Sequence, residues 1–331
     1  QKVLPYSQIA LMYNHIQGGW GASTCGDFNN DGWIDVFTPG ASDHASILAR
    51  DRGVGVSFLL YNPITKTYTD TSLLNDKSID AIPYIQKVVP VYLNSDNYVD
   101  LVLFPADDIK GSIRLVISDG KGRYDMTSII TNENDTYRGS KPTIFLSPGD
   151  IADLNGDKLP DLFIAANNHS YIFWGIAAFP YFSNKDFVDM KTDFSFYTKL
   201  KDINKDGYND IFIANNIQNK MLINNGKGVF SGKEINTPYP TSSTNTMNVY
   251  DYIVDDLNGD GLNDFININA TNHLNWTIEA YIQQANGSFN RELSWVEYTL
   301  SLNRTEYRNK LIYYDFDGDG KKDITYSDTG M

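Results

Sequence analysis

The sequence predicts an all-β fold, and three observations carry this prediction. A short motif of aspartate, asparagine and glycine recurs six times along the 331 residues. Each copy is followed directly by an apolar run that is continuous rather than alternating, which is typical of a strand covered on both faces. Further along each repeat, Asp-Gly and Asn-Gly pairs lie between aromatic and aliphatic runs, and such pairs are the strongest short-range signal of a β-hairpin.

The motif is clearest in Asp256-Leu-Asn-Gly-Asp-Gly-Leu-Asn-Asp264, which places oxygen-bearing side chains at positions 1, 3, 5 and 9. Calcium takes about six to eight oxygen ligands, which alternating side chains and one backbone carbonyl can supply around a tight turn. Gly261 at position 6 allows the positive φ with which a chain folds back over an ion. The motif begins like a helix–loop–helix calcium site, but it ends in aspartate at position 9 and runs into a strand.

The copies are spaced as a repeat. They start at positions 27, 92, 153, 202, 256 and 315, so that successive starts are 65, 61, 49, 54 and 59 residues apart. A single copy would be weak evidence, because Asp, Asn and Gly also form ordinary turns. Six copies at a nearly regular period indicate a repeat architecture. We therefore expect residues 1–331 to form one domain, although the length alone would suggest roughly two.

The predicted metal ligands are the side chains at positions 1, 3, 5 and 9 and the backbone carbonyl at position 7. Five copies are complete, and in the sixth Tyr92 replaces the first aspartate, so five or six Ca²⁺ ions are expected. The predicted ligands are Asp27, Asn29, Asp31, Trp33 and Asp35; Asn94, Asp96 and Asp100; Asp153, Asn155, Asp157, Leu159 and Asp161; Asp202, Asn204, Asp206, Tyr208 and Asp210; Asp256, Asn258, Asp260, Leu262 and Asp264; and Asp315, Asp317, Asp319, Lys321 and Asp323.

Each repeat reads as strand A, calcium loop, strand B, connection, strand C, hairpin turn and strand D. Apolar runs such as 101–104, 162–165 and 265–268 supply strand B, and the turns at 118–124, 224–230 and 284–289 join C to D. Four antiparallel strands about every 58 residues, buried on both faces, describe a blade of a β-propeller. Six blades are expected, with seven as the alternative, and residues 1–18 are expected to close the ring. A calcium-bound β-solenoid is disfavoured because its repeats are much shorter.

The motif, its following apolar strand and the later hairpin Asn224-Asn-Gly-Lys-Gly-Val-Phe230 together resemble the FG-GAP/VCBS repeat family. Repeats of this family build the calcium-binding propellers of integrin α-subunits, certain fungal lectins and many bacterial surface proteins. The resemblance covers essentially the whole chain and implies the fold and the metal, but it says little about a ligand. The chain departs from the pattern at Tyr92, at Lys158 in place of glycine, and in lacking the Phe-Gly and Gly-Ala-Pro signatures, so an integrin-like partner is not supported.

The charge of the chain agrees with bound cations. The formal net charge is −14, and 18 of the 35 aspartates lie in the six loops, against only 6 glutamates in the chain. Six Ca²⁺ ions would change −14 to −2, whereas a merely soluble or halotolerant acidic surface would use both residue types. The charge disfavours nucleic acid and anionic membranes as partners. No apolar stretch is long enough to span a membrane, and one cysteine allows no intrachain disulfide. Loops of this type suit millimolar extracellular calcium, which predicts a secreted or cell-surface protein.

A ligand is expected on the face opposite the calcium loops, because the resemblance implies binding at the B–C and D–A connections. The first B–C connection, residues 40–55, is long, and long loops are often functional. Tryptophan can stack on sugars, although in a blade it also packs between sheets. His44, His169 and His273 each follow the last aspartate of their motif by 8 or 9 residues, which suggests a shared face. They could instead be ordinary turn residues. The candidate ligand-binding residues are His44, Arg50, Arg52, His169, Trp174, His273 and Trp276.

These patterns favour a non-enzymatic recognition or adhesion module that binds a glycan or an extracellular protein. No nucleophile elbow, phosphate loop or HExxH motif is present, and no catalytic residue is predicted. Two alternatives stay open. One is a lyase-like enzyme that acts on polysaccharides, since such sites have little local signature. The other is a scaffold domain of a larger surface or toxin protein, without a ligand of its own.

Overall fold

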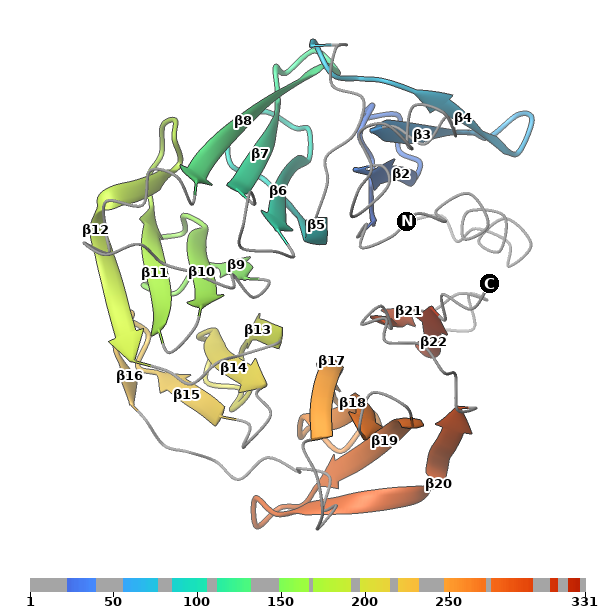
Figure 1. The fold of residues 1–331 in the computed structure, drawn as a ribbon, viewed down its shortest axis with the longest axis vertical. Coiled ribbons are helices and arrows are strands. Elements are labelled where there is room, and N and C mark those ends of the chain that lie inside the picture. The colour runs from blue at the N-terminus through green and yellow to red at the C-terminus, as the bar shows by residue number, and fades with distance from the viewer. Residues whose placement is uncertain are drawn as a thin grey trace. The chain divides into compact units, whose positions relative to one another are not determined.

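The computed structural model of the chain describes residues 23–39, 56–76, 85–105, 112–131, 149–166, 169–191, 197–214, 220–231, 247–271, 275–299, 310–314 and 321–327. All regular elements in these ranges are β-strands, as the sequence predicts (Figure 1). A membrane-crossing helix is not found among them. The chain divides into two compact units, which are described separately below.

The first unit comprises Gln1–Pro148, Trp174–Asp186 and Asp315–Gly320. It contains two four-stranded antiparallel sheets in which each strand pairs with the next along the chain. The first sheet has β1 (Thr24–Gly26), β2 (Asp35–Thr38), β3 (Ser57–Asn62) and β4 (Thr67–Thr71), and the second has β5 (Ile85–Val91), β6 (Asp100–Pro105), β7 (Ser112–Ser118) and β8 (Tyr124–Thr131).

The second unit comprises Gly149–Phe173, Phe187–Tyr314 and Lys321–Met331. Its sheets repeat the same strand order. They consist of β9 (Asp150–Ala152), β10 (Asp161–Ala166), β11 (His169–Gly175) and β12 (Phe182–Lys191); β13 (Tyr197–Lys201), β14 (Asp210–Ala214), β15 (Lys220–Asn224) and β16 (Phe230–Ser231); β17 (Met247–Asp255), β18 (Asp264–Thr271), β19 (Asn275–Gln283) and β20 (Phe289–Thr299); and the pair β21 (Lys310–Tyr314) and β22 (Asp323–Ser327). The hairpin between β11 and β12 belongs to the first unit.

Neighbouring sheets within each unit meet through their first strands. Strand β1 contacts β5 in the first unit, and β9, β13, β17 and β21 contact one another in succession in the second. A four-stranded meander whose first strand faces the first strand of the next meander is the blade arrangement of a β-propeller. The predicted fold class and blade architecture are therefore confirmed.

The predicted number of blades was wrong. Over the residues that the structure describes there are five four-stranded blades rather than six or seven, and the sixth motif is flanked there by the two strands β21 and β22 only. A complete blade has four strands, and strands C and D of this sheet are not among the described residues. The expectation that residues 1–18 complete this sheet lies outside the described residues.

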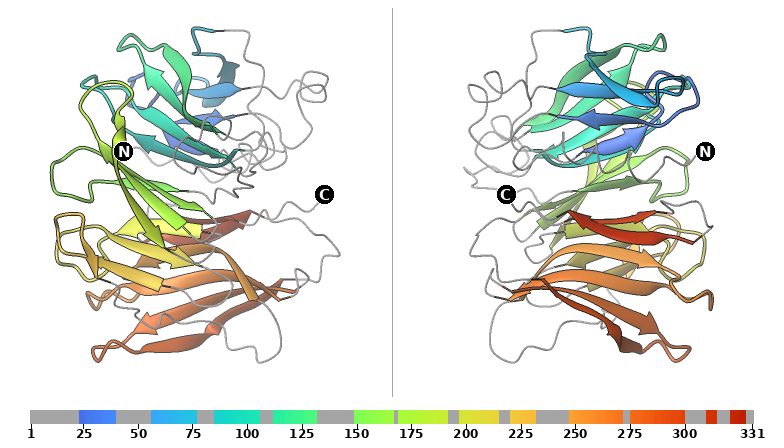
Figure 2. Two further views of the ribbon diagram at one scale, coloured as in Figure 1. Left: turned by 60° about the vertical axis from the view of Figure 1, so that its left-hand side comes forward. Right: turned by 90° about the vertical axis from the view of Figure 1, so that its right-hand side faces the viewer.

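The apolar run after each motif is buried on both faces, as its continuous pattern predicts. In β18, Phe265 packs with Phe212 of β14, whereas the next residue, Ile266, packs into a separate cluster against which Ile324 of β22 lies. Both side chains are 0 % exposed. Figure 2 shows β17–β20 as one twisted sheet. The central strands have no face left for solvent, so an alternating pattern would be unstable there.

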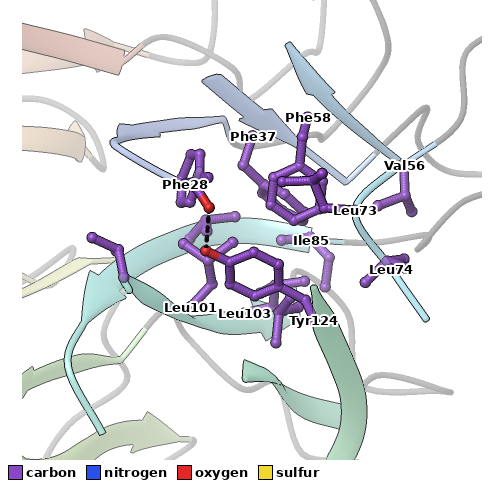
Figure 3. Packing of buried hydrophobic residues seen from close by; sticks show 13 residues of the cluster. Phe28, Phe37, Val56, Phe58, Leu73, Leu74, Ile85, Leu101, Leu103 and Tyr124 are labelled. Carbon is purple, nitrogen blue, oxygen red and sulfur yellow. Dashed lines mark hydrogen bonds between the residues drawn. The ribbon is translucent and has the colours of Figure 1, made fainter. Parts of the chain in front are cut away.

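A large aromatic cluster joins the two sheets of the first unit (Figure 3). Tyr124 at the start of β8 is fully buried and stacks on Phe58, with ring centroids 5.1 Å apart. Its hydroxyl donates a hydrogen bond of 2.9 Å to the carbonyl of Phe28, which lies in the first motif. The buried Tyr124 hydroxyl therefore has a partner, as buried polar groups require, and the second sheet is tied to the first motif loop.

Candidate functional site

The motif residues form loops in which side-chain oxygens are satisfied by nearby backbone amides. In the loop 256–264, the carboxylate of Asp256 accepts hydrogen bonds from the amides of Asp260 and Gly261 at 3.1 and 2.8 Å. Asn258 accepts from the amide of Asp260 at 2.9 Å, and Asp260 accepts from the amide of Leu262 at 2.8 Å. These short-range bonds are Asx turns, which explains why Asp and Asn alternate along the loop.

The complete loops that begin at Asp27, Asp153 and Asp202 repeat this pattern. The first aspartate of each accepts the amide of position 6, at 2.7, 2.9 and 2.8 Å respectively. Position 6 has a positive φ in every case, including the non-glycine Lys158 at 72°. The chain therefore folds back at position 6 as predicted, and glycine is favoured there but not required. In all four of the complete loops that the structure describes, the asparagine at position 3 also donates to the carboxylate at position 5.

The aspartate at position 9 has a different environment from the other loop carboxylates. The five described members of this group, Asp35, Asp100, Asp161, Asp210 and Asp264, are all 0 % exposed. Asp264 accepts the amide of Leu257 at 2.9 Å with one oxygen and the amide of Gln283, at the end of β19, at 2.8 Å with the other. This carboxylate therefore ties its loop to strand C of the same blade.

Burial sets the acidity of these position-9 carboxylates. Burial raises the pKa of Asp35 to about 6, against the opposing effect of the hydrogen bonds from the amides of Tyr61 and Phe28. Burial likewise raises the pKa of Asp100, Asp210 and Asp264. By contrast, the hydrogen bond from the amide of Leu262 lowers the pKa of the exposed Asp260. Two classes of aspartate thus exist within one loop, one buried and one solvated.

The donor set suits a hard cation, since every side chain at positions 1, 3 and 5 presents oxygen. A carboxylate has about four acceptor sites in total, and Asp256 and Asp260 use only part of that capacity on the loop amides. In the conformation described, no group of three or more His, Cys, Asp or Glu side chains within the described ranges is arranged to hold a metal ion. The residues therefore fit calcium by chemistry, while their carboxylates are directed at backbone amides.

Adjacent loops of the second unit are hydrogen-bonded to one another. The side-chain amide of Asn263, at position 8 and only 3 % exposed, donates to the carbonyls of Asp202 and Ile203 in the preceding loop at 3.1 and 2.8 Å. Asn224 of β15 donates at 2.8 Å to the carbonyl of Leu154, again in the preceding loop. Asn209, at position 8 of the preceding copy, likewise donates to the carbonyl of Asp153 at 3.4 Å. Sequence reasoning missed these contacts, although asparagine at position 8 in two successive copies was a visible signal for those of Asn209 and Asn263.

The loop 92–100 differs from the complete loops. Tyr92 at position 1 is 59 % exposed. The side-chain amide of Asn94 donates to the carbonyl of Ser118 at 3.1 Å instead of to Asp96. Asp100 keeps its position-9 role and accepts the amides of Leu93 and Ser118, both at 2.8 Å. This loop therefore keeps the link from Asp100 to strand C of its blade, but it lacks a carboxylate at position 1.

The candidate ligand residues are only partly described. His44, Arg50, Arg52 and His273 lie outside the described residues, as do Asp315, Asp317 and Asp319 of the sixth loop. His169 and Trp276 lie at the beginnings of β11 and β19, on the side of the B–C connections. Trp174 is half-buried near the other end of β11, beside the turn into β12. The structure thus does not place Trp174 with His169 at one end of the sheet.

The family model of the FG-GAP-like repeat matches residues 256–325. The predicted resemblance is thereby confirmed over the fifth motif, the three strands of its blade that follow it, and the sixth motif. No curated protein matches the chain.

Among solved structures, the chain is similar to an Agrocybe aegerita lectin whose structure concerns recognition of non-reducing terminal N-acetylglucosamine. The identity is 16%, the TM-score is 0.56, and the match covers 94% of this chain and 75% of the lectin. A complex of BBS1N with ARL6DN gives 10% identity and a TM-score of 0.49, over 92% of this chain and 75% of the other. For the Photorhabdus luminescens Tc holotoxin pore the identity is 15% and the TM-score is 0.45, and the match covers 98% of this chain and 14% of the other. At such identities only the likeness to the lectin bears on the fold, and none establishes a function.

Proposed function

We propose that the chain is a calcium-stabilised recognition module that acts outside the cell, secreted or on its surface, and binds a glycan. The observation that carries the metal part is the same oxygen arrangement in the four complete described loops, each with a half-buried carboxylate at position 1 and an exposed one at position 5. Bound calcium would be held by these side chains, the position-3 asparagine and the position-7 carbonyl. A cation there would offset the repulsion among the carboxylates of one loop.

The metal part is tested by thermal unfolding in the presence of a chelator. We expect the melting temperature to fall by several degrees in EDTA and to recover with Ca²⁺. Mg²⁺ should restore it poorly, because Mg²⁺ demands a stricter octahedral geometry. An unchanged melting temperature in EDTA would contradict the metal proposal. The loop 256–264 should bind calcium well, and the loop 92–100, which lacks one carboxylate, should bind weakly or not at all.

The glycan part is supported by the blade architecture shared with the Agrocybe aegerita lectin. This support is at the level of the fold, so it sets the class of partner to be tried first and not the sugar. A glycan array probed with the calcium-loaded chain is the direct test. Absence of binding to any glycan would contradict this part of the proposal, whatever the outcome of the calcium experiment.

The long connection 40–55 is the ligand site that the sequence predicts. If it binds the glycan, replacing Arg50 and Arg52 together with alanine should abolish binding and leave the calcium-dependent melting temperature unchanged. Retained binding in this double variant would place the site elsewhere on the protein.

A further inference from the structure

A fully buried side-chain amide in the fifth blade has no hydrogen-bond partner. Asn267, in the middle of β18, is 0 % exposed, yet neither its Oδ1 nor its Nδ2 atom is hydrogen-bonded to any residue that the structure describes. Asn224 and Asn263, the other asparagines among the buried described residues, both donate to backbone carbonyls. Burying an unpaired amide is unfavourable, and in folded proteins nearly all such groups are bound by protein or by ordered water.

Asn267 lies at the end of an apolar cluster in the interface between the fourth and fifth blades, both in the second compact unit. Phe265, two residues earlier and therefore on the same face of β18, packs in this cluster with Phe212 of β14. Across the sheet, Asn267 pairs with Tyr252 of β17 and with Glu279 of β19. Residues directly opposite each other in antiparallel strands have Cβ atoms about 4.5–5.5 Å apart. The amide of Asn267 and the carboxylate of Glu279 are therefore neighbours on one face.

Glu279 extends this polar position towards the surface. Its side chain is 4 % exposed, and its carboxylate accepts a hydrogen bond of 2.7 Å from the hydroxyl of Tyr281 and another from the guanidinium of Arg291. The side chain of Arg291 is 40 % exposed. A row of polar groups therefore leads from the solvent at Arg291, through the carboxylate, to the unpaired amide of Asn267. No direct hydrogen bond closes the last step of this row.

The outer strand of the blade is irregular beside this row. Where the register of β19 and β20 shifts, Glu279 alone of β19 faces residues 293–296 of β20. An irregularity of this kind interrupts the hydrogen-bond ladder and bends the longer strand, and such features are typical of positions that re-aim a side chain or adjoin a site. A small bound molecule beside Glu279 is therefore compatible with the ladder, which is already broken there.

We propose that Asn267 and Glu279 bind ordered water in the interface between the fourth and fifth blades. One water molecule bridges the side-chain amide of Asn267 and the carboxylate of Glu279, and a second satisfies the other atom of the amide. Water both donates and accepts, and a buried molecule typically makes about three hydrogen bonds to groups that would otherwise be unpaired. The bridge links β18 to β19 where the two side chains make no direct hydrogen bond. This site is separate from the calcium loops and from the glycan-binding function.

Other ligands fit this position less well than water. A metal ion would compete with Arg291 and with the hydroxyl of Tyr281, which already donate to the carboxylate. An anion would be repelled by the carboxylate of Glu279, and an apolar group would leave the amide of Asn267 unpaired. The complete burial of Asn267 disfavours a molecule of the size of a sugar.

The direct test is a crystal structure of the calcium-loaded chain at a resolution that shows ordered water. We expect density between Asn267 and Glu279, at about 2.7–3.2 Å from both the amide and the carboxylate. An amide without adjoining density would overturn the proposal, and so would a direct hydrogen bond from the amide to another protein group. Density at about 2.3–2.6 Å from several oxygens would also overturn it, because that is the distance of a calcium ion.

Two substitutions of nearly the same shape test the site in solution. Asn267→Thr and Asn267→Val differ only in a hydroxyl group in place of a methyl group, and both side chains suit a strand. If water is bound, the hydroxyl of the Asn267→Thr variant keeps a partner, so its unfolding midpoint in urea should be higher than that of Asn267→Val. In a dry site the order is reversed, because the hydroxyl is then buried without a partner.

The order of the two midpoints decides the outcome. A midpoint of Asn267→Val equal to or above that of Asn267→Thr would overturn the proposal. The same order is expected in Ca²⁺ and in EDTA, since neither residue 267 nor residue 279 belongs to a motif loop. If neither variant folds, the crystal structure of the parent chain still decides. Neither measurement depends on whether the chain binds a glycan.

Discussion

The position-9 aspartates should stabilise the blades even without a metal ion, and Asp264→Ala tests this directly. Removing the carboxylate leaves two amides, those of Leu257 and Gln283, without an acceptor. An orphaned buried donor costs about 1–3 kcal/mol, and because these two hydrogen bonds are only part-buried the gross loss is at most about 2–6 kcal/mol. Part of this loss is offset because the buried carboxylate itself is poorly solvated, as its raised pKa indicates. The net effect should therefore lie in the lower half of that range.

The assay is urea unfolding followed by intrinsic fluorescence, with the chelator EDTA present so that calcium makes no contribution. The matched control is Asp260→Ala in the same loop, because this aspartate is exposed and its amide donor can turn to water. In EDTA, Asp264→Ala should lower the unfolding midpoint clearly, whereas Asp260→Ala should change it little. In Ca²⁺, both variants should lose the increment that the ion supplies.

An equal effect of the two substitutions in EDTA would refute the reasoning. It would show that the hydrogen bonds from Leu257 and Gln283 to Asp264 add nothing beyond the metal site. A large effect of Asp264→Ala only in Ca²⁺ would lead to the same conclusion, because the aspartate would then act as a ligand alone.

Three further substitutions test contacts between and within blades, each by its urea unfolding midpoint. Tyr124→Phe leaves the buried carbonyl of Phe28 without its donor and should cost about 1–3 kcal/mol; an unchanged midpoint would show that water replaces the hydroxyl. Asn263→Ala removes two hydrogen bonds to the preceding loop and should cost a similar amount, about 1–3 kcal/mol, whereas a neutral effect would mean that the loops are independent. Gly226→Ala should destabilise the protein for two reasons: the new Cβ would lie 2.5 Å from the ring of Tyr208, and residue 226 has a φ of 78°. Adding Tyr208→Ala to this variant removes the clash but not the backbone strain, so it should restore only part of the lost stability.

Sequence reasoning predicted the local features of each blade correctly. The continuous apolar run that contains Phe265 and Ile266 is a buried central strand, and the turn around Gly226 joins strands C and D. The positive φ at Gly261 was also predicted from its place in the motif. These features depend on partners within about nine residues or on the two-residue period of a strand, so that they can be read from spacing alone.

The spacing of the motifs did not determine the number of blades. Spacing identifies six motifs, but a motif specifies only strands A and B of its blade. Whether a sheet gains strands C and D depends on chain that follows the motif, and the pair β21–β22 has none among the described residues. Counting motifs therefore overestimated the number of complete blades.

By itself, the sequence determined that the chain consists of propeller-type repeats with oxygen-rich loops between strands A and B. Only the tertiary structure decided which aspartates are buried, since the second amide bound by Asp264 belongs to Gln283, 19 residues further along the chain. It also decided that Asn263 reaches the carbonyl of Ile203, 60 residues away. Hydrogen bonds within a loop follow from chain geometry, whereas contacts between distant segments exist only once the sheets have packed.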